Sequence, residues 1–113
     1  MTMARMQIPE EQLSAFIIYL ALGVLQTILE KAVPPEVGIW TLGAPQMWSE
    51  FEGNSHISQE VIDTLQACDE LSALQELAPE EFEGEVKKLI KGLHIELSKI
   101  PDPIWSIKWT IPA

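Results

Sequence analysis

Apolar side chains are concentrated near the start of the chain, and their pattern predicts the helix around which the rest is built. Between Leu13 and Leu29 the sequence reads LSAFIIYLALGVLQTIL. On a helical wheel these apolar residues cover roughly two-thirds of the circumference. The positions that suit water fall on one narrow strip: Gln12, Tyr19, Gly23, Gln26 and Glu30. A helix with this many apolar residues is expected to be either a central core helix or a membrane segment.

Length favours the core helix. The uninterrupted apolar run, Ala15 to Leu25, has eleven residues, whereas a membrane span needs about 20. Glu10 and Glu11 precede the run, where a signal peptide would carry positive charge. We therefore predict a buried helix and no membrane partner.

Prolines and glycines mark the predicted helix ends. The central helix is expected to begin near Pro9 and to run to about Ala32, where Val33-Pro34-Pro35 stops it. A short helix is expected over residues 45–52 and is closed by Gly53. This segment is too short to be stable alone, so it must dock on the core.

A longer helical region follows Ser58, a residue that suits an N-cap. Ile57 and Ile62 have the spacing of a hydrophobic staple around that cap. Asp69 offers a second starting point, so residues 58–78 fit one bent helix or two short helices. The sequence leaves both alternatives open.

The most regular pattern lies in residues 79–100. Apolar residues recur every three or four positions in one narrow stripe: Phe82, Val86, Leu89, Ile90, Leu93, Leu97 and Ile100. Glutamates crowd the first turns and lysines the later ones, as the helix macrodipole prefers. We predict an amphipathic helix that begins at Pro79 and is ended by Pro101.

Two segments are typical of β-strands. Residues 38–42 contain the β-branched or aromatic residues Ile39, Trp40 and Thr41 between Gly38 and Gly43, and residues 104–111 alternate between apolar and polar side chains from Trp105 onward. We expect these two segments to pair, either on the helices or with further pairing across a subunit interface. The prediction is thus a mainly α fold in one domain over residues 1–113: a small bundle around a central apolar helix, with a minor two-stranded β element.

Charge and cysteine content exclude several classes of function. The 113 residues carry a net charge of −10, and residues 32–86 hold twelve acids with no lysine or arginine. This distribution disfavours nucleic-acid binding, which needs clustered basic residues. It suits a basic protein partner or a solvated helix surface. The single cysteine excludes an intrachain disulfide and fits a reducing, cytoplasmic location.

No pattern in the sequence indicates an enzyme. Cys68 falls on an apolar stripe and His94 lies just off the core stripe of the last helix, so a Cys68–His94 dyad is disfavoured. His56 and His94 lack metal-ligand spacing to the acids, and Gly38 and Gly43 match no phosphate-binding loop. We therefore expect no catalysis, no metal and no cofactor.

The four tryptophans carry the most information about binding. They lie outside the long helices, and their simplest role is a second core layer. Tryptophan is also enriched at interaction hot spots. The candidate interface or pocket residues are Trp40, Trp48, Trp105, Trp109, Ile107 and Ile111.

These observations favour a non-catalytic interaction module that forms a homodimer through its C-terminal strand. One alternative is an acidic inhibitor, of the immunity-protein or antitoxin kind, that masks a basic partner. Another is a small-molecule binder or enzyme with a tryptophan-lined pocket.

Overall fold

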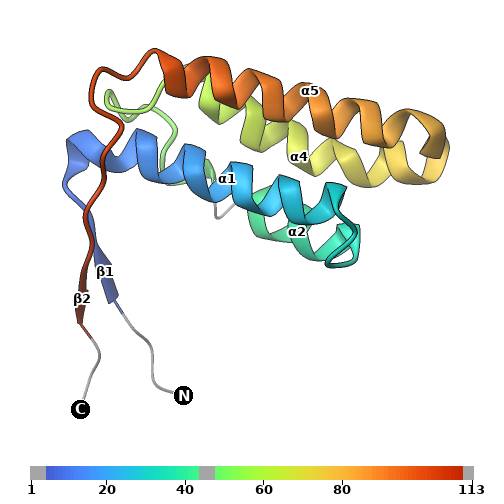
Figure 1. Ribbon diagram of the computed structural model, residues 1–113, viewed down its shortest axis with the longest axis horizontal. Helices are drawn as coiled ribbons and strands as arrows, with labels where there is room; N and C mark the ends of the chain where they lie inside the picture. The colour runs from blue at the N-terminus through green and yellow to red at the C-terminus, as the bar shows by residue number, and fades with distance from the viewer. Residues whose placement is uncertain (1–4, 44–47, 111–113) are drawn as a thin grey trace.

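A computed structural model describes the backbone of residues 5–43 and 48–110, with side chains up to residue 107. Within these ranges the long helices are α1 (Leu13–Leu29), α4 (Gln59–Leu77) and α5 (Pro79–Ser98), and a shorter helix is α2 (Pro35–Gly43). A 3-10 turn, η1 (Glu10–Gln12), leads into α1, and two short strands, β1 (Arg5–Gln7) and β2 (Lys108–Thr110), pair with each other. The predicted mainly α bundle is confirmed (Figure 1).

The four helices form a ring, and α1 and α4 also contact each other across it. α1 lies against α2 and α5, and α4 lies against the same two helices from the other side. Among the described elements, α2 and α5 do not contact each other. The core lies inside this ring, and its most buried side chains include Ile17, Leu25, Leu42, Leu65 and Leu93.

Helix α1 is the central apolar helix that the sequence predicts. Ile17, Ile18 and Leu25 are fully buried, whereas Tyr19 and Gln26 on the predicted strip are exposed. The helical stretch Glu10–Leu29 is also long and apolar enough, by length and composition, to cross a membrane. A core helix has the same length and composition, so the absence of a membrane partner stays a prediction.

The end of α1 differs from the prediction. The helix stops at Leu29, and not near Ala32, because Lys31 adopts a left-handed conformation with a φ of 59°. The Lys31 N–H donates to the Ile28 carbonyl at 3.1 Å, and the Ala32 N–H donates to the Thr27 carbonyl at 3.0 Å. This is a Schellman ending. It turns the chain before the prolines, so that α2 begins at Pro35.

The predicted strand over residues 38–42 is wrong, because this segment lies within helix α2. A Cβ atom on Gly38 would collide with the Ile28 side chain of α1, and one on Gly43 would lie 2.6 Å from the Asp69 backbone nitrogen of α4. The two glycines therefore let a short helix approach both neighbours closely. The solvent-facing side of this helix carries the apolar residues Val37 and Trp40, which are 53% and 67% exposed, so the sequence shows no polar stripe and resembles that of a buried strand.

Residues 59–77 form one helix, which settles the alternatives left open by the sequence. The predicted N-cap is confirmed, since the Ser58 hydroxyl accepts a hydrogen bond from the Val61 N–H at 3.3 Å. Ile57 and Ile62 are both buried, as the staple requires. Residues 45–47 of the predicted short helix lie outside the described residues, and the chain turns at Gly53 with a φ of 83°.

Helix α5 begins at Pro79 and ends at Ser98, close to the predicted bounds. Val86 and Leu93 of its stripe are fully buried, and the other stripe residues pack around the core. Near its end, the Glu96 carboxylate accepts a hydrogen bond from the Ser58 hydroxyl at 3.0 Å and pairs with Lys99 at 2.6 Å. Glu96 thus joins the end of α5 to the start of α4.

The prediction of a two-stranded β element is only partly confirmed. The strand within residues 104–111 covers Lys108–Thr110, and its partner is Arg5–Gln7, not residues 38–42. The pairing is antiparallel, with Met6 opposite Trp109. A three-residue strand is too short to show the alternation that identifies strands in a sequence, which explains why β1 was not predicted.

Candidate functional site

The predicted interface residues occupy three different places in the structure. Trp105 follows α5 and packs edge-on against Phe16 of α1, with ring centroids 5.1 Å apart. Next to it, Ser106 donates from its N–H to the Gln12 side-chain oxygen at 2.8 Å, and Ile107 is half-buried. This part of the tail is therefore docked on the start of α1.

Trp40 lies within helix α2, so the expectation that it belongs to a strand outside the helices is wrong, and Trp48 follows α2 in the chain. Trp40 is 67% exposed, and Val37, one turn earlier on the same helix, is 53% exposed. Trp48 is half-buried and its indole N–H donates to the Gly43 carbonyl at 3.3 Å, so it braces the end of α2. The side chain of Trp109 and the whole of Ile111 lie outside the described residues.

Strands β1 and β2 form a terminal ribbon, a name we use for residues 5–7 and 108–110 together. The ribbon extends away from the helices beside the start of α1 (Figure 1). In the part of the chain that the structure describes, each strand contacts the other strand and no helix. The sheet has two strands, so each has an outer edge without a strand partner among the described residues.

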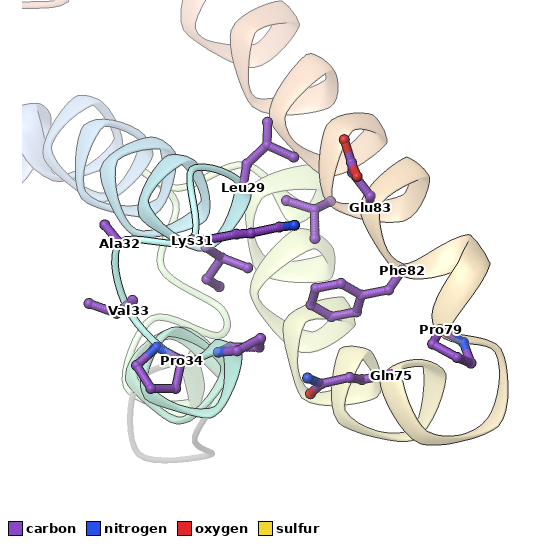
Figure 2. Close-up of a pocket in the computed structure, with 12 residues that line it drawn as sticks. Leu29, Lys31, Ala32, Val33, Pro34, Gln75, Pro79, Phe82 and Glu83 are labelled. Carbon is purple, nitrogen blue, oxygen red and sulfur yellow. The ribbon is translucent and has the colours of Figure 1, made fainter.

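A cavity of about 630 Å³ opens at the opposite end of α1 (Figure 2). It lies between the starts of α2 and α5, which are the two helices of the ring that do not touch. Ile28, Pro34, Phe82 and Val86 contribute apolar walls. The polar lining residues are Lys31, Gln75 and Glu83.

This cavity is not the tryptophan-lined pocket that the sequence suggests as an alternative. No tryptophan lines this cavity or a smaller one of about 360 Å³ beside Leu74 and Leu77. Sequence reasoning missed the cavity because its walls come from positions up to 58 residues apart along the chain, from Ile28 to Val86. The sequence also predicted that Lys31 lies inside a helix, because no residue type in that stretch indicates a left-handed turn.

The structure provides no basis for chemistry at the cysteine. Cys68 is 1% exposed, and burial raises the pKa of its thiol to about 12. At neutral pH the thiol is therefore protonated and enclosed, which are both unfavourable for a nucleophile. His56 and His94 are exposed. Within residues 5–43 and 48–107, no three His, Cys, Asp or Glu side chains are placed to hold a metal ion.

The acidic middle of the chain is solvated. Eleven of the twelve acids between residues 36 and 85 are exposed, and Glu85 is half-buried. In the part of the chain that the structure describes, only Glu83 among them forms an ion pair, with Lys87 at 3.1 Å. The negative charge is thus available at the surface.

Together these features define a small helical domain that has a buried, inert cysteine and a two-stranded ribbon made from segments near its two ends. The family model described as "Protein of unknown function (DUF3969)" matches residues 9–111. The chain belongs to this family. No curated protein and no solved structure matches it.

Proposed function

We propose that this protein is a non-catalytic interaction module that self-associates through its terminal ribbon. The observation that carries the proposal is the isolation of the ribbon, whose strands contact no helix among the described elements. Two strands alone are marginally stable in water. A ribbon that has no helix beneath it therefore needs a further partner.

A second copy of the chain is the simplest partner. The outer edges of β1 and β2 present backbone donors and acceptors, which are templates for pairing with another strand. A two-fold arrangement covers the same edge in both copies, because the same surface serves each of them. Met6, which is 40% exposed, adds apolar area next to that edge.

Light scattering after size-exclusion chromatography tests the proposal. The intact chain is expected to have twice the chain mass of 12.7 kDa, and a chain truncated after Ile107 is expected to be monomeric. This truncation keeps Trp105 and Ser106 docked on α1, so it removes the second strand without removing the contacts to the helices.

Two substitutions serve as controls at other exposed apolar positions. Trp40→Ser removes the exposed tryptophan of α2, and Leu77→Ser changes a residue that is 84% exposed at the end of α4. Both variants should remain dimeric. A dimer that survives the truncation but is lost in Trp40→Ser would place the interface on α2 and refute the proposal.

A basic protein partner is the second candidate function, and the exposed acids favour it. Eleven exposed acids with little internal pairing suit electrostatic attraction to a positive surface. Binding of this kind should weaken steeply with salt, since the Debye length falls to about 8 Å at physiological ionic strength. Salt-independent capture of a basic partner would contradict this role for the acids.

A further inference from the structure

The cavity at the end of α1 has the size and lining of a small-molecule site. Its volume of about 630 Å³ lies within the usual range for ligand pockets, about 300–1,000 Å³. The ring of helices explains why it is hollow: α2 and α5 face each other across the ring without contact among the described residues. Phe82 points into the cavity from α5, opposite Pro34 (Figure 2).

Lys31 occupies a backbone position that normally carries glycine. Its φ of 59° makes it the one non-glycine residue in the left-handed region among the described residues. A side chain in this conformation costs roughly 1–2 kcal/mol, which is why glycine is usual at the end of a Schellman turn. Backbone strain that persists in this way is often found where a side chain is needed for function.

The Lys31 side chain lies along the cavity. Figure 2 shows it extending from the α1–α2 loop toward α5, over the apolar walls. Its ammonium group forms no hydrogen bond or ion pair in the described part of the chain. The nearby acids are already engaged: Glu83 pairs with Lys87 at 3.1 Å, and Glu30 accepts a hydrogen bond from Gln26 at 3.0 Å.

An apolar cavity with one unengaged cation complements a ligand with one anionic group and an apolar body. We infer that this cavity binds a small amphipathic monocarboxylate, with the carboxylate on Lys31 and the hydrocarbon portion between Phe82, Val86 and Pro34. Burial of the hydrocarbon supplies most of the affinity. Lys31 supplies the preference for an acid, because a charge-assisted hydrogen bond is stronger than a neutral one.

The strain at Lys31 provides a test that separates binding from folding. Lys31→Gly removes the cation and also relieves the left-handed backbone, so it should raise the melting temperature. The same substitution should weaken the binding of decanoate about tenfold, the loss expected for one hydrogen bond to a charged group. Isothermal titration calorimetry of both proteins with decanoate measures this difference.

Decanol and decylamine are the matched probes for charge. Decanol should bind the intact chain and Lys31→Gly with equal affinity. Its affinity for the intact chain should be lower than that of decanoate. Decylamine should also bind the intact chain more weakly than decanoate does. In NMR titrations with decanoate, the shifts should be centred on Phe82 and Val86. Absence of decanoate binding, equal decanoate affinity in Lys31→Gly, or shifts centred on Trp40 or the terminal ribbon would overturn the inference.

Discussion

The helical body and the terminal ribbon differ in how they are stabilised. In the body, short helix α2 is held between α1 and α4 so closely that a Cβ atom at Gly43 would meet the backbone of Asp69. In the ribbon, two three-residue strands pair with each other and contact no helix among the described elements. The body is therefore held by packing between helices, whereas the ribbon, among the described elements, is held only by the pairing of its own two strands.

The largest expected effect concerns the closest contact in the body. Gly43→Ala places a Cβ atom 2.6 Å from the Asp69 nitrogen and 2.8 Å from its Cα, and backbone atoms cannot move aside easily. We expect a loss of about 3 kcal/mol in the free energy of unfolding, measured in urea. Gly23→Ala is the control, since nothing lies within 4 Å of its new Cβ. Equal stability of the two variants would show that α2 does not approach α4 so closely.

A smaller loss is expected for Gly38→Ala. Here the close atoms are side-chain atoms, Cδ1 and Cγ1 of Ile28 and Cγ1 of Val24 at 3.1 Å, and side-chain atoms move aside more easily than the backbone atoms at Gly43. Helix propensity also improves by about 1 kcal/mol when alanine replaces glycine, which offsets part of the clash. The net loss should be about 1 kcal/mol, and Ile28→Val in the same chain should reduce it. A loss as large as that of Gly43→Ala would mean that Ile28 cannot adjust.

The contact between Glu96 of α5 and Ser58 at the start of α4 predicts that the stability of the helical body depends on pH. The hydrogen bond from Lys99 lowers the pKa of Glu96 below its usual value, and burial opposes this shift. Because the folded pKa is the lower one, this stabilisation is complete above the unfolded pKa of about 4.3 and is lost as the pH falls through the folded pKa.

Replacing this carboxylate tests the link directly. Glu96→Gln should lower the free energy of unfolding by about 1 kcal/mol at pH 7, because it weakens the hydrogen bonds to Ser58 and Lys99. The difference from the intact chain should shrink as the pH falls below the unfolded pKa of about 4.3 and vanish once the pH is below the folded pKa of Glu96. Glu83→Gln, at an exposed ion pair, is the control and should change stability less. A difference that persists unchanged at low pH would contradict the assignment to the charge of Glu96.

The smallest expected effect is that of the ribbon on the stability of a single chain. At dilutions where the protein is monomeric, truncation after Ile107 should change the free energy of unfolding by less than about 0.5 kcal/mol, because the ribbon contacts no helix. Trp105→Ala should cost more, since it removes the edge-on packing on Phe16. A large loss on truncation would show that the ribbon belongs to the body.

The sequence predicts those parts of the fold that have one buried side and one solvated side. The apolar stripe of helix α5 and the N-cap residue Ser58 are both visible in the sequence, so both features were predicted correctly. Helix α2 was mistaken for a strand because two of its solvent-exposed positions carry the apolar residues Val37 and Trp40, so the sequence shows no polar stripe that would reveal a helical period. The left-handed Lys31 and the cavity beside it depend on contacts between distant segments, which periodicity does not report.

The central claim is that two copies associate through their terminal ribbons, and isotope-filtered NMR tests it most directly. A sample that mixes labelled and unlabelled chains reports only contacts between copies. The account predicts intermolecular contacts at residues 5–7 or 108–110. Intermolecular contacts confined to α2 around Trp40, or none at concentrations where the mass is that of one chain, would contradict it.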